Sequence, residues 1–149
     1  MITVLLVDDH ASVRRGLRYL LEATEDIKVI AAVSSGMEAV AQSNSACPDV
    51  AIIDISMPSM DGIETTRQLR ANCRSTRVMM LSIYDNPEYV QRALEVGASG
   101  FVLKDKISDD LLAAIRSLHG GRRYFSQKVV EIAKKYMDEK GQDLWTSPV

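Results

Sequence analysis

The feature that most constrains this chain is a regular alternation of short, continuous apolar runs with amphipathic segments. The runs cover residues 4–7, 29–33, 50–53, 78–81 and 100–103 and consist mainly of Val, Ile and Leu. Each run is too short for a helix, and unbroken apolarity indicates a strand buried on both faces. The sequence therefore predicts a parallel sheet that is covered on both sides.

The amphipathic segments between the runs predict the covering helices. They begin near Ser12, Met37, Ile63, Pro87 and Ser108, and Ser12 is expected to cap the first helix. Right-handed crossovers between the strands then give an α/β fold, a (βα)5 doubly wound sheet with helices on both faces. For its strands we expect the order 2-1-3-4-5, one of the common arrangements of such sheets. Residues 1–121 form this domain. In the tail, residues 122–149, we predict a linker helix over 126–140 and a linker from 141 onward.

Composition narrows the function classes. The 149 residues carry a formal net charge of -2, so no overall basic field favours nucleic acid. No apolar run approaches the length of a membrane span, and the apolar start lacks the basic leader of a signal peptide. Cys47 and Cys73 lie far apart without a C-x-x-C motif, which favours reduced thiols in a cytoplasmic protein over a disulfide or a metal site.

Acidic residues stand at the ends of two predicted strands. Asp8 and Asp9 follow the first run, and Asp54 follows the third. In the predicted sheet these strands are neighbours at the point where the chain reverses direction, which is where such sheets bind ligands. Three converging carboxylates repel one another unless a cation joins them, and oxygen ligands select Mg²⁺. A carboxylate beside a metal can attack phosphorus and carry an acyl phosphate.

The fourth and fifth runs also end on polar residues, Ser82 and Lys104. At equivalent strand ends, Ser82 can donate a hydrogen bond to one phosphoryl oxygen, and Lys104 can pair with another. Taken singly, a loop serine, a surface lysine and helix-capping aspartates would be the simpler interpretations; their joint occurrence favours one site. His10 adjoins the acidic pair without a second nitrogen or sulfur ligand, so we interpret it as a loop residue.

Together these residues resemble the receiver-domain signature of bacterial two-component response regulators, which have a flavodoxin-like fold. The resemblance rests on Asp8-Asp9, the run D-I-S-M-P-S-M-D-G at 54–62, Ser82 and Lys104, and it extends to about residue 121. It implies phosphorylation of Asp54 by a sensor histidine kinase. It also implies Mg²⁺ bound by Asp9, Asp54 and the backbone carbonyl of Ser56, with Asp8 acting chiefly through water. Ser82 would be the switch hydroxyl, Lys104 the phosphate-binding lysine and Phe101 the rotating aromatic.

Segments 7–10, 81–85 and 103–105 resemble the NarL/FixJ (LuxR-type) transcription regulators, in which a helical linker leads to a C-terminal helix-turn-helix. DNA binding is therefore expected only through an output domain that this sequence lacks. Phosphorylation is expected to change the surface formed by residues 87–96, 100–103 and 107–118. A homodimer would form through that surface or through the tail helix. Tyr84 either gates the pocket or covers the start of the helix at Pro87.

Two positions depart from the family pattern: Asp105 stands where many receivers have proline, and bulky Ile83 stands where a small residue is usual. Three alternative functions are also consistent with parts of this pattern. One is a stand-alone receiver that signals by protein contact. Another is a Mg²⁺-dependent phosphohydrolase of the haloacid-dehalogenase class, but its nucleophile lies on the first strand and here the candidate lies on the third. A degenerate receiver is disfavoured because all five signature side chains are intact.

Overall fold

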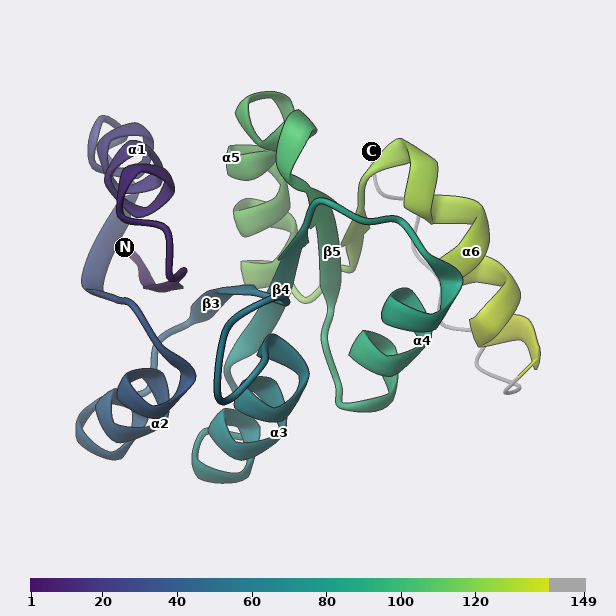
Figure 1. Ribbon diagram of the computed structural model, residues 1–149. Helices are drawn as coiled ribbons and strands as arrows, with labels where there is room; N and C mark the ends of the chain where they lie inside the picture. The colour runs from purple at the N-terminus through teal and green to yellow at the C-terminus, as the bar shows by residue number, and fades with distance from the viewer. Residues whose placement is uncertain (140–149) are drawn as a thin grey trace.

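The computed structural model describes residues 1–139, in which strands and helices alternate along the chain (Figure 1). The strands are β1 (Ile2–Val7), β2 (Ile27–Val33), β3 (Val50–Asp54), β4 (Arg77–Ser82), β5 (Gly100–Leu103) and β6 (Tyr124–Phe125). The helices are α1 (Ala11–Glu22), α2 (Gly36–Ser45), α3 (Gly62–Asn72), α4 (Pro87–Glu95), the 3-10 turn η1 (Lys104–Lys106), α5 (Ile107–His119) and α6 (Gln127–Glu139). Among the described residues, no helix combines the length and apolarity that a membrane span requires.

All strand pairs are parallel, and the sheet order is β2-β1-β3-β4-β5-β6. The first five strands confirm the predicted order 2-1-3-4-5. The sixth strand was not predicted. Its residues, Tyr124 and Phe125, pair with Gly100 and Phe101 at the β5 edge. A strand of two residues is too short to leave a periodic signal in the sequence.

The helices cover both faces of the sheet, as the unbroken apolar runs predicted. Figure 1 shows α1 and α5 on one face and α2, α3 and α4 on the other. Alternate strand residues enter two separate cores: Leu6 and Ile52 pack with the α1–α5 side, while Leu5 and Ile53 pack with the α2–α4 side. Every residue of β3 is buried. The central strand thus fixes Asp54, its last residue, in a rigid setting.

The tail helix α6 lies beside α4 (Figure 1). Its residues Val129 and Ala133 are fully buried and belong to the same core as Val90 of α4 and Phe101 of β5. An isolated helix of this length is marginal in water, so this packing is what stabilises it. The helix predicted over 126–140 is therefore present over Gln127–Glu139. Lys140 and the linker predicted from 141 onward lie outside the described residues.

The prediction of reduced thiols was wrong, because the structure joins Cys47 and Cys73 in a disulfide. Cys47 follows α2 and Cys73 ends α3, and these two helices pack side by side. Their ends bring the two Cα atoms to 5.6 Å, within the range that a bridge requires. A sequence separation of 26 residues gave no sign of this proximity.

Candidate functional site

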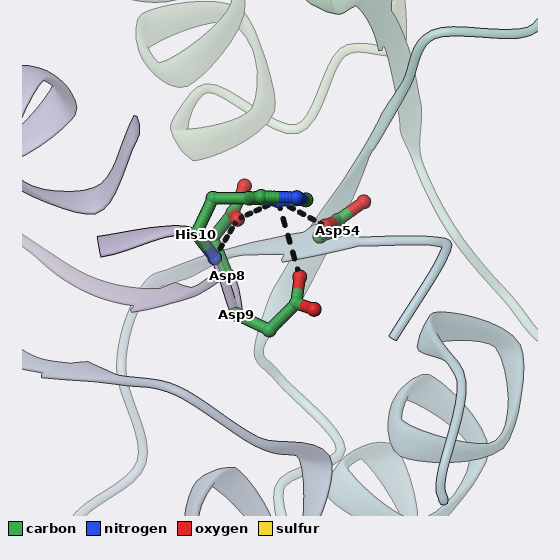
Figure 2. Close-up of side chains that lie close together, drawn as sticks. All are labelled: Asp8, Asp9, His10 and Asp54. Atoms are coloured by element: carbon green, nitrogen blue, oxygen red, sulfur yellow. Dashed lines mark hydrogen bonds and ion pairs between the residues drawn. The ribbon is translucent and has the colours of Figure 1, made fainter. Parts of the chain in front are cut away.

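Three carboxylates meet at the carboxyl ends of β1 and β3 (Figure 2). Val7 and Ile53 are register partners in the sheet, so Asp8 and Asp54 follow at the same level on neighbouring strands. Asp8 is 1% exposed and Asp54 is 2% exposed, while Asp9 stands at the rim. The convergence expected from the strand ends is therefore present.

These carboxylates are only partly satisfied by hydrogen bonds. Asp8 Oδ1 accepts from the His10 backbone N–H at 2.8 Å, and Asp54 Oδ1 accepts from the Ser56 N–H at 3.2 Å. Within residues 1–139, the second oxygens of Asp8 and Asp54 are buried and accept no backbone hydrogen bond, and the Lys104 ammonium is the cation that faces both of them. Buried carboxylate oxygens without donors are costly unless a cation compensates them. This donor set fits a hard divalent cation.

Lys104 supplies one positive charge to the pocket from the first residue of η1, directly after β5. Its Nζ lies 3.3 Å from Asp8 Oδ2 and 3.2 Å from Asp54 Oδ2. One ammonium cannot neutralise three carboxylates. Burial and the negative charge of Asp8 raise the pKa of Asp54 to about 6, although Lys104 and the Ser56 N–H act in the opposite direction. The surroundings of Asp54 in the pocket thus destabilise its ionised form.

Ser82 is the last residue of β4 and is buried beside this pocket, where its Oγ accepts from the Tyr84 N–H at 2.9 Å. Tyr84 is 45% exposed, and its ring centroid lies 5.9 Å from that of Tyr89 in α4. Tyr84 thus contacts the first turn of α4, and its role as a gate or as a cover for this helix start stays a prediction. Ile83 is largely exposed to solvent, at 65%. Phe101 is already buried, at 1% exposure.

The Asp61-Gly62 pair, to which sequence reasoning gave no individual roles, sets the position of α3. Asp61 caps the helix by accepting from the Glu64 N–H at 2.9 Å. A Cβ on Gly62 would lie 2.4 Å from the carbonyl oxygen of Asp54 and 2.6 Å from the Cα of Ile55. Only glycine allows this close approach. The pair thus packs the start of α3 directly against the segment that carries Asp54.

Sequence reasoning missed the position of His10. The prediction that Ser12 caps α1 was wrong. The helix begins at Ala11 and its N-cap residue is His10, whose side chain makes no capping hydrogen bond to the helix backbone. This earlier start turns the imidazole over the acidic pocket (Figure 2), where its Nδ1 lies 3.3 Å from both Asp8 Oδ1 and Asp9 Oδ1. The sequence feature that could have indicated this position is that His10 directly follows Asp8 and Asp9.

Comparisons with known proteins agree with this geometry. Residues 4–116 match the response regulator receiver domain family. Two curated relatives from Escherichia coli (strain K12) are similar: the response regulator UvrY is 34% identical over 88% of this chain, and the nitrate/nitrite response regulator NarL is 35% identical over 87%. The aligned part covers 60% of each relative, so the chain spans well under two thirds of their length.

A solved structure, a two-component response regulator of the LuxR family from Aurantimonas sp. SI85-9A1, superposes with a TM-score of 0.85 at 30% identity. The superposition covers 91% of this chain and 96% of that one. The likeness therefore extends well beyond the acidic pocket.

Proposed function

The chain belongs to the response regulator receiver family, and from this premise we propose that Asp54 accepts a phosphoryl group from a sensor histidine kinase with the help of Mg²⁺. The observation that carries the proposal is the Asp54 carboxylate itself. It ends the buried strand β3, its Oδ1 accepts from the Ser56 N–H, and its Oδ2 faces the Lys104 ammonium at 3.2 Å. A carboxylate that is held in place and lies beside a cationic group is suited to act as a nucleophile.

Asp8, Asp9, Asp54 and the backbone carbonyl of Ser56 would hold the Mg²⁺. The fit rests on the carboxylates of Asp8, Asp9 and Asp54, whose oxygen atoms lie within 4.8 Å of one another, because oxygen donors suit this ion. When bound, the ion offsets negative charge on the carboxylates and on the transferred phosphoryl group. The Ser56 N–H fixes one oxygen of Asp54, which leaves the other aimed at the pocket.

In the transfer, an oxygen of Asp54 forms a new bond to phosphorus as the bond from phosphorus to the kinase histidine nitrogen breaks. The electron pair of that bond returns to the imidazole. Lys104 then pairs with an oxygen of the new acyl phosphate, because its Nζ already lies between Asp8 and Asp54. Ser82, at the end of the next strand, donates its hydroxyl hydrogen to a second phosphoryl oxygen.

The switch passes from Ser82 to Phe101 on the neighbouring strand β5, and from there to the tail. The Phe101 carbonyl accepts from the Ser126 N–H at 3.0 Å, and the Leu103 N–H donates to Ser126 Oγ at 3.0 Å. Ser126 Oγ donates in turn to Asp110 of α5, also at 3.0 Å. Because of these hydrogen bonds, a movement of β5 toward the phosphoryl group would also displace β6, α5 and the start of α6.

The surface formed by α4, β5 and α5 is the output surface in this proposal, and α6 already lies on its α4 side. Phosphorylation changes the position of α6 relative to α4. This change controls homodimerisation through the output surface or through α6. Residues 1–121 act as the receiver and residues 122–149 lead to a helix-turn-helix output domain that regulates transcription. The site of action is the cytoplasm, where response regulators generally work.

The test of the acceptor is phosphorylation by acetyl phosphate and Mg²⁺, followed by intact-mass measurement. Wild-type protein should gain one phosphoryl group, and Asp54→Asn should gain none. Asp49→Asn, a change at the opposite end of the same strand, is the matched control and should remain phosphorylated. Equal labelling of Asp54→Asn and wild type would place the acceptor elsewhere.

The test of the switch uses Ser82→Ala with beryllofluoride, a phosphoryl mimic. The variant should bind the mimic but fail to shift the amide resonances of β5, β6 and α6, because the hydrogen bond that distinguishes the two states is missing. Shifts equal to those of wild type would show that Ser82 is not the switch hydroxyl, even with Asp54 as the acceptor.

A further inference from the structure

His10 is the group in the pocket that the phosphoacceptor chemistry leaves unused. Its Nδ1 lies 3.3 Å from Asp8 Oδ1, 3.3 Å from Asp9 Oδ1 and 3.9 Å from Asp54 Oδ2. Figure 2 shows the ring spanning the pocket, with these three contacts running to carboxylates from β3 and from the loop after β1. One nitrogen therefore faces all three acidic side chains.

The position of the ring follows from its backbone. The His10 N–H donates to Asp8 Oδ1 at 2.8 Å, and the His10 carbonyl accepts from the Arg14 N–H at 3.0 Å in the first turn of α1. Arg14 also donates from Nη1 to the Asp8 carbonyl at 2.7 Å, which ties the start of α1 to the end of β1. The imidazole is thus carried on a fixed helix start and not on a free loop.

The orientation of the ring is not a consequence of burial. The His10 side chain is 62% exposed, so its nitrogens can be hydrated without entering the pocket. The four candidate donor atoms, one from each of Asp8, Asp9, His10 and Asp54, all lie within 4.8 Å of one another. Opposite ligands of one small divalent ion are about 4.2 Å apart, so modest side-chain adjustment brings all four around a single ion.

We propose that His10 is a nitrogen ligand of the divalent cation in this pocket and makes the site selective for transition ions over Mg²⁺. The inference rests on the proposed function, in which the carboxylates hold a divalent cation. The second observation behind it is the burial of Asp8 and Asp54, whose second oxygens accept no backbone hydrogen bond and share the single ammonium of Lys104. Three carboxylates alone favour Mg²⁺, whereas an added imidazole favours Co²⁺, Ni²⁺ and Zn²⁺.

The experiment measures Co²⁺ and Mg²⁺ affinity by titration calorimetry, at one fixed pH, on tag-free protein. The variants are His10→Ala, His10→Gln and Asp9→Ala. His119→Ala is the matched control, because His119 is the second of the two histidines in the chain and lies at the exposed end of α5. Proton NMR of the Co²⁺ form supplies a readout independent of affinity, since the ring protons of a ligated imidazole shift far outside their usual range.

We expect both His10 variants to lose Co²⁺ affinity by about tenfold or more while Mg²⁺ affinity changes less than about twofold. His119→Ala should match wild type, and Asp9→Ala should weaken both ions. The shifted ring resonances should be present in wild type and absent from His10→Ala.

Three results would overturn the inference. Unchanged Co²⁺ affinity in His10→Ala would mean that the ring is not a ligand. Tighter Mg²⁺ binding in His10→Ala would mean that the ring competes with the cation. Co²⁺ binding that survives Asp9→Ala at full strength would place the ion elsewhere. A wild-type protein that binds no Mg²⁺ would contradict the proposed function as well as this inference. The three results above, by contrast, contradict only the role of His10 and leave the proposed function standing.

Discussion

Asp49 and Asp54 stand at opposite ends of β3 and have opposite environments. At the amino end, Asp49 Oδ2 accepts from the Thr3 N–H at 2.9 Å, and the Asp49 N–H donates to Thr3 Oγ1 at 2.9 Å. At the carboxyl end, Asp54 is 2% exposed, one of its oxygens accepts no backbone hydrogen bond within residues 1–139, and its pKa is raised to about 6. The same residue type thus closes hydrogen bonds at one end and leaves charge uncompensated at the other.

The contrast extends across the whole sheet. At the amino end, the Thr76 hydroxyl donates to the Pro48 carbonyl at 2.7 Å, and the disulfide between Cys47 and Cys73 joins the loops that follow α2 and α3. At the carboxyl end, Asp8 and Asp54 each accept one backbone hydrogen bond and share the single ammonium of Lys104. Satisfied polar groups hold a fold together, whereas unsatisfied ones raise its free energy until a ligand binds. The amino end is therefore structural, and the carboxyl end is prepared for a ligand.

The largest expected effect concerns the disulfide at the amino end. Replacing both cysteines, as Cys47→Ser with Cys73→Ser, should lower the free energy of unfolding by about 3 kcal/mol, because the cross-link restricts the unfolded chain. Urea denaturation measures the loss. Dithiothreitol should destabilise wild type by a similar amount and leave the double variant unchanged. A double variant as stable as oxidised wild type would contradict a stabilising role for this end.

The second prediction tests the strained carboxylate. Asp54→Asn should raise the free energy of unfolding at pH 7 by about 2 kcal/mol, because it removes a buried charge next to Asp8. The pKa of Asp54 is higher in the folded state than in the unfolded state, so wild-type stability falls as pH rises from about 4 through about 6. The gain should therefore be absent below pH 4 and complete above pH 6.

Denaturation of both proteins across this pH range measures the effect. Asp105→Asn, at an exposed position in η1, is the control and should change stability little at any pH. A loss of stability in Asp54→Asn at pH 7 would mean that Asp54 is a structural carboxylate like Asp49, and the contrast between the two ends would fail.

The third prediction concerns Asp49 at the amino end of β3, where removing the carboxylate should lower stability and not raise it. Asp49→Ala should lower the free energy of unfolding by about 1.5 kcal/mol, because the Thr3 N–H loses a charged acceptor. Thermal or urea denaturation measures the loss, and Asp49→Asn, which keeps an acceptor oxygen, should lose less. Acetyl phosphate labelling should be unaffected in both variants. A stability equal to wild type in Asp49→Ala would show that solvent satisfies this end without the carboxylate.

The smallest expected effect is ligand stabilisation of the carboxyl end. Mg²⁺ at about five times its dissociation constant should raise the free energy of unfolding by about 1 kcal/mol, because only the folded pocket gathers the carboxylates. Thermal denaturation with and without the ion measures this. Asp9→Ala should fold normally, since Asp9 lies at the rim, but should lose the stabilisation. Equal Mg²⁺ stabilisation of this variant and wild type would remove Asp9 from the ligand set.

Much of the site was predictable because its residues occupy strand ends. Unbroken apolar runs identify strands buried on both faces, and the residue after each run must lie at the carboxyl edge of a parallel sheet. That reasoning placed Asp8, Asp54, Ser82 and Lys104 at one edge of the sheet without any coordinates. It failed for His10, because the direction of that ring depends on whether the N-cap residue of α1 is His10 or Ser12. A shift of two residues at a helix start is below what periodicity resolves.

The amino-acid sequence by itself determined the five strands, their burial on both faces and the acidic residues at the strand ends, since local periodicity identifies each strand and the residue that follows it. The strand order 2-1-3-4-5 was an expectation for sheets of this kind, and the structure confirmed it. Only the tertiary structure decided three other features: the bond between Cys47 and Cys73, the pairing of Tyr124–Phe125 with β5, and the contact of His10 with three carboxylates. The first two features join segments that are distant in the sequence, and the third depends on how one side chain is oriented. All three depend on the relative positions of packed helices and strands, which no local sequence pattern encodes. Periodicity reports how a segment meets its core, whereas contacts between segments are set by how whole helices and strands pack against one another.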